Sequence, residues 1–232
     1  MAFHYSERNR DEYYSDGLTI LHGLVPPSLL VDLRREAETA RAIAHERYGP
    51  QAQRLQPVYR YPELNHAPFR EFLALPELRT TVREILGQEH TESDILGILF
   101  EPEDAAWTTG WHRDWLHHVK DLDRGAFFDA VLHQPTTFNQ LNAALYPDRA
   151  LWVVPGSQHR EDTSEELAAH AAGNELPGAV NVVLEAGDVA FYRAVGWHTG
   201  SYVPGAKRAT LHDGFYSPAD RAWQASPPKI SS

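Results

Sequence analysis

Apolar residues recur at helical spacing in the first third of the chain. After Pro26-Pro27 they fall on one face of a helix, at Leu29, Leu30, Leu33, Ala37, Ala40 and Ala44. Charged residues occupy the opposite side, so this segment is predicted to be an amphipathic helix packed on a sheet. Residues 6–15, 69–75 and 76–86 are predicted to be further helices, and residues 18–21 a short strand.

From Asp94 onward, short apolar runs alternate with turn residues such as Pro155-Gly156 and Pro204-Gly205. The runs predicted to be strands are 95–100, 108–112, 138–145, 151–154, 180–184, 189–192, 198–203 and 208–216. A helix is predicted over 163–172, with Thr163 or Ser164 as its N-cap. Residues 115–137 mix charge, glycine and apolar residues and are predicted to be a long loop that forms a lid. Short strands at this spacing predict a β-sandwich or jelly roll.

The chain of 232 residues has the length of one all-β domain with helical additions. We therefore predict a single domain over 1–232, with a helical N-terminal part over about 1–92 and a β core over about 93–218. There is no cysteine, which excludes disulfides, zinc–thiolate sites and thiol catalysis. A transition metal would need His, Asp or Glu as its ligands.

The formal net charge is −11, and the chain has no run of Lys or Arg. Nucleic acids and anionic membrane surfaces both attract clustered cations, so neither is expected as a partner. The N-terminal segment has no apolar signal core and no stretch approaches the length of a membrane span, so we expect a cytoplasmic protein. The sequence leaves the oligomeric state open.

Two residues with metal-ligand chemistry, His112 and Asp114, lie two positions apart at the end of a predicted strand. Alternate side chains of a strand point the same way, so both can reach one metal while Arg113 points elsewhere. A second imidazole, His198, lies downstream in the segment 196–200. Two imidazoles and one carboxylate are the ligand set of the facial triad that holds non-haem Fe(II). The alternative is that the first pair lies in a solvated turn and that His198 is a buried, hydrogen-bonded histidine.

A candidate anchor for an anion, Arg208, follows His198 by ten residues. The Pro204-Gly205 turn between them lets the chain fold back as the adjacent strand, which would bring Arg208 beside the metal. A guanidinium binds a carboxylate through two parallel hydrogen bonds, and Thr210 on the same face can add a hydroxyl donor. The target would be the distal carboxylate of a dicarboxylate such as 2-oxoglutarate. The alternative for Arg208 is an ion pair with a surface acid.

Five segments resemble, in their order and spacing, the phytanoyl-CoA dioxygenase (PhyH)-like branch of the Fe(II)/2-oxoglutarate-dependent oxygenases. They are 13–21, 24–38, 111–114, 151–159 and 184–192. The resemblance implies a mainly β fold with flanking helices, built on a double-stranded β-helix core (a cupin-like jelly roll). It also implies Fe(II) at His112, Asp114 and His198, 2-oxoglutarate held by Arg208 with Thr210, and dioxygen as the oxidant.

The same resemblance suggests further contacts around the metal. In the family, the strand before the Pro-Gly-Ser turn faces the co-substrate, and alternation along 138–145 puts Gln140 and Asn142 on one face. These two residues are predicted to contact the co-substrate, or else they satisfy backbone groups between strands. The residues that could contact the substrate are Trp115, His117, His118 and Arg193. The alternatives are core packing for the tryptophan and a solvated loop for the two histidines.

We therefore predict an Fe(II)- and 2-oxoglutarate-dependent dioxygenase that hydroxylates a small-molecule metabolite or natural-product intermediate and releases succinate and CO2. In the halogenating relatives a small residue replaces the carboxylate ligand and leaves a position for chloride. This chain keeps Asp114, so the resemblance favours hydroxylation, or another oxidation such as desaturation or ring closure. Two other classes stay open: a cupin-like metalloenzyme that does not use 2-oxoglutarate, and a non-catalytic jelly-roll binding module.

Overall fold

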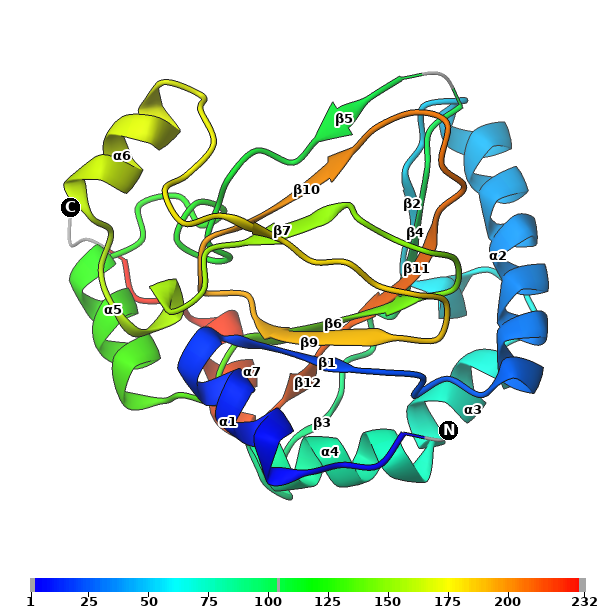
Figure 1. The fold of residues 1–232 in the computed structure, drawn as a ribbon, viewed down its shortest axis with the longest axis horizontal. Coiled ribbons are helices and arrows are strands. Elements are labelled where there is room, and N and C mark those ends of the chain that lie inside the picture. The colour runs from blue at the N-terminus through cyan, green and yellow to red at the C-terminus, as the bar shows by residue number, and fades with distance from the viewer. Residues whose placement is uncertain (1–2, 104, 230–232) are drawn as a thin grey trace.

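Two antiparallel sheets form the centre of the computed structural model, which describes residues 3–103 and 105–229 (Figure 1). The larger sheet has the strand order β1 (Leu18–Leu21), β9 (Val189–Arg193), β6 (Asn139–Ala144), β11 (Ala209–Asp213), β4 (Gly97–Phe100) and β2 (Arg54–Leu55). The smaller sheet has the order β5 (Trp107–Thr108), β10 (His198–Tyr202), β7 (Leu151–Val153) and β8 (Val180–Asn181). A separate pair joins β12 (Phe215–Tyr216) to β3 (Thr91–Glu92). These sheets with flanking helices confirm the predicted jelly-roll class.

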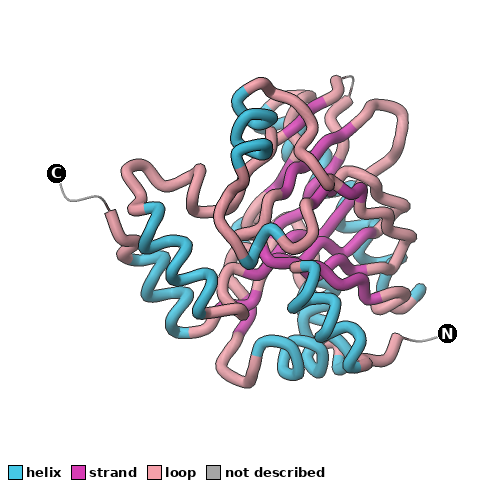
Figure 2. Tube along the Cα trace, turned by 60° about the vertical axis from the view of Figure 1, so that its left-hand side comes forward, coloured by secondary structure: helices cyan, strands magenta, loops and turns pink. Residues whose placement is uncertain are grey.

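Helices surround the strands (Figure 2). The described α-helices are α1 (Glu7–Asp16), α2 (Pro27–Tyr48), α3 (Ala67–Ala74), α4 (Pro76–Leu86), α5 (Arg124–His133), α6 (Ser164–Ala171) and α7 (Pro218–Ala225). Two short 3-10 helices are η1 (Val58–Arg60) and η2 (Ser157–His159). Among the described residues, no helix combines the length and the apolar character that crossing a membrane requires.

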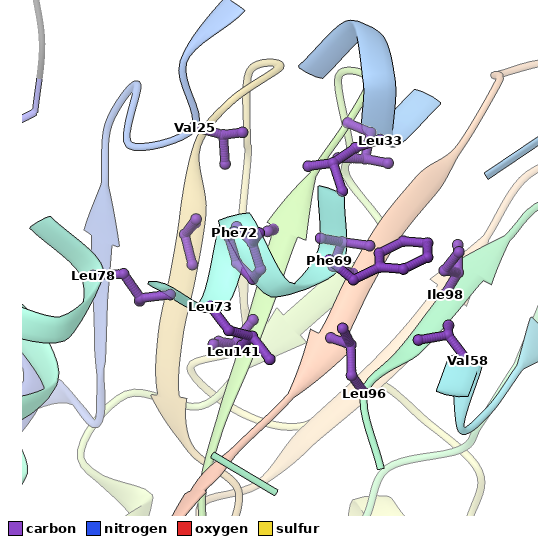
Figure 3. Packing of buried hydrophobic residues seen from close by; sticks show 14 of the residues in the cluster. Val25, Leu33, Val58, Phe69, Phe72, Leu73, Leu78, Leu96, Ile98 and Leu141 are labelled. Carbon is purple, nitrogen blue, oxygen red and sulfur yellow. The ribbon is translucent and has the colours of Figure 1, made fainter. Parts of the chain in front are cut away.

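Strand alternation gives the larger sheet one face toward the helices and one toward the smaller sheet. On β9, Val189 and Phe191 belong to the main hydrophobic core, where Phe69, Phe72 and other residues of the helices pack (Figure 3). Their neighbours Ala190 and Tyr192 belong to a second cluster, together with side chains of the smaller sheet. The same rule applies to β11, where Ala209 and Leu211 face the helices, so Thr210 and His212 face the smaller sheet. Alternation along a few strands therefore decides which side chains face the space between the two sheets.

Local signals in the sequence place most helix ends correctly. The helix α1 begins after Ser6, which forms a capping box with Asn9, and ends at Gly17 with φ +79°. A Cβ atom at Gly17 would lie 2.5 Å from the end of the Gln158 side chain, which would have to shift, so the positive φ is the main reason for glycine there. The helix α6 begins after Thr163, whose hydroxyl accepts a hydrogen bond from the backbone N–H of Glu166.

The prediction of a lid loop over 115–137 is wrong, because that segment contains α5. Its N-cap is Asp123, whose carboxylate accepts from the backbone N–H of Ala126, and it buries Phe127, Phe128 and Val131. Apolar residues occur around this helix without forming one clear stripe, and the sequence pattern therefore did not reveal its period. The helix α7, which follows β12, was also missed.

The prediction that the chain returns after Pro204-Gly205 as the strand adjacent to β10 is also wrong. The strand β11 pairs with β4 and β6 in the larger sheet, whereas β10 pairs with β5 and β7 in the smaller one. The turn therefore carries the chain from one sheet to the other. Residues after the turn face β10 across the interior of the jelly roll.

Candidate metal and co-substrate site

A pocket of about 400 Å³ lies in the interior of the jelly roll, between the two sheets. The predicted site residues that line it are His112, Asp114, His118, Gln140, Asn142, His198 and Arg208. Along β10, His198 and Gly200 line this pocket. The fold therefore brings together residues that lie up to 96 positions apart, counted from His112 to Arg208.

Backbone pairing sets His112 and His198 side by side. Each donates its backbone N–H to the carbonyl of the other at 3.0 Å, and their ring centroids are 4.2 Å apart. The backbone N–H of Asp114 donates to the carbonyl of Ala194 at 2.9 Å, so the segment 112–114 is paired along its length with the chain around His198. Arg113 points the opposite way, as predicted: it is fully buried and forms an ion pair with Asp162 at 2.8 Å.

Both imidazoles present the same nitrogen to Asp114. The Nδ1 atom of His112 lies 2.8 Å from the carbonyl of Gly110, and that of His198 lies 3.0 Å from the carbonyl of Gly196. A ring whose Nδ1–H donates to a carbonyl keeps a free lone pair on Nε2. The two Nε2 atoms lie 3.5 Å (His112) and 3.9 Å (His198) from Oδ1 of Asp114.

This donor set fits a divalent metal such as Fe(II). Burial, followed by the nearby His198, lowers the pKa of His112 to about 4, so its imidazole is neutral at neutral pH. Neutral imidazoles and a carboxylate are the form in which these side chains bind a transition metal.

A third imidazole, His118, also approaches Asp114, with its Nδ1 atom 3.4 Å from Oδ1. By distance alone, His112, Asp114 and His118 form a possible metal-binding group, whose ligand atoms lie within 4.8 Å of one another. The side chain of His118 is 57% exposed, whereas that of His198 is 7% exposed and is oriented by a backbone carbonyl. A preorganised ligand binds metal more tightly than a mobile one, and this favours His198 as the third ligand and places His118 at the mouth of the pocket.

Gln140 and Tyr192 orient the carboxylate of Asp114. The Nε2 amide of Gln140 donates to Oδ2 of Asp114, and the hydroxyl of Tyr192 donates to Oε1 of Gln140 at 2.6 Å. Burial, with the charge of Asp114 next in size, raises the pKa of Tyr192, so the hydroxyl stays a donor. Gln140 therefore lines the pocket, and its amide is already used by the predicted metal ligand Asp114, so its contact with the co-substrate stays a prediction.

Asn142 pairs with His212, a pocket residue that sequence reasoning missed. The Nδ1 atom of His212 lies 2.8 Å from Oδ1 of Asn142. Burial, followed by the charge of Arg54, lowers the pKa of His212 to about 4, so the neutral ring donates to the amide oxygen. Alternation along β11 was the available signal, because His212 shares a face with Arg208 and Thr210.

Arg208 is held along one edge by Asp148. Its Nε atom donates to Oδ2 of Asp148 at 2.8 Å, and the hydroxyl of Thr210 donates to the same oxygen at 2.6 Å. Burial raises the pKa of Asp148, but the charge of Arg208 and the hydrogen bond from Thr210 outweigh it and hold that pKa below its usual range. Among the described residues, the buried Nη1 atom of Arg208 has no hydrogen-bond partner. A carboxylate bound in the pocket would supply one, so the site fits the distal end of 2-oxoglutarate.

Three predicted contacts require correction. Thr210 is fully buried and donates to Asp148, so it supports Arg208 and does not line the pocket. Trp115 has φ +69° and packs against Phe138 and Trp223, which takes it out of the pocket. Arg193 is 2% exposed and donates to the carbonyl of Val131, because it follows Tyr192 on β9 and so points to the other face of the sheet.

The remaining substrate candidate, His117, lies beside the pocket and not in it. Its Nδ1 atom accepts the backbone N–H of Arg113 at 2.9 Å, and its ring lies 5.0 Å from that of Trp197. Two further pocket residues had no signal in the sequence. They are Arg54, an exposed cation, and Trp107, whose indole N–H is buried without a partner among the described residues.

A jelly roll that gathers two free Nε2 atoms, an oriented carboxylate and a buried arginine in one pocket defines a non-haem iron oxygenase that uses a 2-oxoacid co-substrate. The chain belongs to the phytanoyl-CoA dioxygenase (PhyH) family, whose sequence model matches residues 13–209. It is therefore an enzyme of the Fe(II)- and 2-oxoglutarate-dependent oxygenases, with iron, 2-oxoglutarate and dioxygen as cofactor and co-substrates. A search of curated proteins finds no match.

Several solved structures share the fold at low sequence identity. AviO1 from Streptomyces viridochromogenes Tue57 is 19% identical, with a TM-score of 0.66, and the match covers 99% of this chain and 100% of that one. EctD from S. alaskensis, solved with 2-oxoglutarate and 5-hydroxyectoine, is 18% identical, with a TM-score of 0.69 and coverage of 93% and 77%. SnoN, an alpha-ketoglutarate-dependent epimerase from nogalamycin biosynthesis, is 20% identical, with a TM-score of 0.65 and coverage of 91% and 82%. At these identities the likeness concerns the fold.

Proposed function

We propose that the protein is a hydroxylase that acts on a small molecule in the cytoplasm and forms succinate and CO2 from 2-oxoglutarate. The observation that carries this proposal is the carboxylate of Asp114, which faces the Nε2 atoms of His112 and His198. When all three side chains hold the metal, no coordination position is left vacant by a missing protein ligand. A halide ion therefore has no such position to occupy. The structural relatives include an epimerase and a carbocyclase, so the fold alone does not determine the outcome of the reaction.

Bound iron and 2-oxoglutarate would supply the oxidising chemistry that activates dioxygen and attacks a C–H bond. The chain positions the reactants. His112, Asp114 and His198 hold the metal on one side, and the Gln140 and Tyr192 hydrogen bonds fix the carboxylate in place. Because His112 is neutral at neutral pH, metal binding there displaces no proton.

Arg208 orients the co-substrate from the opposite wall of the pocket. Asp148 occupies its Nε edge, which leaves Nη1 for the distal carboxylate of 2-oxoglutarate. The distance between this anchor and the metal ligands then decides which dicarboxylates fit, because one end must reach each. Burial of the guanidinium, which is 4% exposed, excludes water from the interaction and strengthens it.

The test measures succinate formed from 2-oxoglutarate under air with added Fe(II), and follows labelled oxygen from dioxygen into the product. Loss of succinate formation in Asp114→Ala and Arg208→Ala, with labelled hydroxyl in the wild-type product, is expected. Metal-dependent activity that survives Arg208→Ala would instead indicate a cupin-like enzyme that does not use 2-oxoglutarate. Unchanged metal content in Asp114→Ala would indicate a binding module whose histidines are incidental.

A further inference from the structure

A second hollow of about 750 Å³, here called the outer groove, lies on the other face of the smaller sheet. Alternation along β10 separates the two hollows: His198 and Gly200 line the metal pocket, whereas Thr199 and Ser201 line the outer groove. Its other wall comes from the end of α6 and the chain that follows, which returns along the smaller sheet (Figure 1). The groove is therefore a separate surface beside the site already described.

The floor of the outer groove is a row of hydroxyl groups next to an indole. Strand register places Ser201 beside Thr108 and Thr199 beside Trp152. The hydroxyls of Thr108 and Thr199 lie 3.3 Å apart, and Trp152 is half-buried, so part of its ring is available. A second half-buried indole, Trp111, also lines the groove. Aromatic faces next to hydroxyl donors and acceptors suit a ring that is apolar on its faces and polar at its edge.

The charges around the outer groove disfavour an anionic ligand. Its titratable nitrogen groups are the imidazoles of His112, His117, His118 and His170, and burial lowers the pKa of His112 and His117. Neither Lys nor Arg is among the described residues that line it. The far wall carries Asn174 and the exposed carboxylate of Glu175, which forms no ion pair among the described residues. A carboxylate or phosphate here would meet the like charge of Glu175 and no Lys or Arg side chain. A purely apolar ligand would place no polar group against the side chains of Ser201 and Asn174. A neutral ligand that carries several hydroxyl groups satisfies both conditions.

The outer groove also reaches the metal. Three residues, Thr109, His112 and His118, line both hollows, so the two meet at the edge of the smaller sheet. We propose that the outer groove binds a neutral sugar ring, which anchors a substrate whose neighbouring part enters the metal pocket. The link to oxidation rests on the proposed function, whereas sugar binding itself depends only on the groove.

The test is isothermal titration calorimetry on the protein loaded with Fe(II) and 2-oxoglutarate without dioxygen, and on the metal-free protein. The probes are maltose, cellobiose and lactose, the matched anion cellobiouronic acid, and octanol as an apolar probe. We expect saturable binding of at least one neutral disaccharide, at least tenfold weaker binding in Trp152→Ala and in Asn174→Ala, and unchanged binding in Tyr48→Ala. Tyr48 is a suitable control because it is 63% exposed and lies outside both hollows.

The outcomes separate this inference from the proposed function. Sugar binding that depends on Trp152, without succinate formation, supports the sugar site in the outer groove and contradicts the proposed hydroxylase activity. Absence of binding by all three neutral disaccharides, or equal binding of cellobiouronic acid and cellobiose, overturns the sugar site even if another substrate is hydroxylated. The variant Glu175→Lys adds a cation to the groove and is expected to improve binding of the uronic acid relative to cellobiose.

Discussion

Asp213, at the end of β11, is predicted to destabilise the folded protein at neutral pH. It is 1% exposed, and its Oδ1 atom accepts hydrogen bonds from the Gly214 backbone and the Ser93 hydroxyl. Its other oxygen, Oδ2, is buried without a partner among the described residues. Burial dominates and raises the pKa of Asp213 from 3.8 to about 7.

The sign of the effect follows from proton linkage. The folded state binds this proton more tightly than the unfolded state, so folding stability decreases as pH rises from the unfolded pKa near 3.8 through the folded pKa near 7. The difference between the two pKa values corresponds to a loss of about 4 kcal/mol in folding stability above pH 7, at about 1.36 kcal/mol per pKa unit. Between about pH 5 and pH 8 the cost grows by about 2–3 kcal/mol.

The variant Asp213→Asn removes the charge and keeps the oxygen that accepts from Ser93 and Gly214. Its free energy of unfolding, measured by urea denaturation with circular dichroism, is expected to exceed that of the wild type at about pH 8 by about 2–3 kcal/mol more than at about pH 5. The exposed neighbour Asp94 provides the control, since Asp94→Asn should show no such trend. A wild-type-to-variant difference that is the same at both pH values would refute the reasoning.

Three further predictions test the site and its support. Asp148→Ala should weaken 2-oxoglutarate binding at least tenfold, measured by the absorption of the Fe(II)–2-oxoglutarate complex, whereas Asp148→Asn should restore most of it because an amide oxygen still accepts from the guanidinium. His198→Ala should lose Fe(II) binding in equilibrium dialysis, whereas His118→Ala should keep it; the reverse result would make His118 the third ligand. Gly214→Ala should lower the free energy of unfolding by about 1–3 kcal/mol, because its Cβ would lie 2.6 Å from the Asn139 carbonyl; an unchanged thermal midpoint would contradict this.

Features that depend on neighbouring residues could be predicted from the sequence. The start of α1 after Ser6 and its end at Gly17 follow from capping chemistry, and most of the strands from alternation between turns. Alternation also gave the opposite orientations of Asp114 and Arg113. The order of the motifs was sufficient for the family, which the match over 13–209 confirms.

Features that depend on distant residues were missed or wrong. The helix α5 has no clear apolar stripe, and only the packing of Phe127, Phe128 and Val131 shows which side is buried. Trp115 and Arg193 lie close in sequence to the predicted metal ligands but point away from the pocket. Proximity along the chain does not determine direction where a turn or a change of strand face intervenes.

The sequence by itself determined the chemistry available to this protein: two imidazoles, a carboxylate and an arginine in an order typical of one family. The tertiary structure decided which of these groups meet, and in which state. Arg208, beside β11 of the larger sheet, faces the metal ligands across the interior and is held by Asp148, which lies 60 residues away in the chain. The local pattern of apolar and polar residues cannot reveal such a contact. The contact arises because the two sheets pack on each other and because burying a charge without a partner is costly.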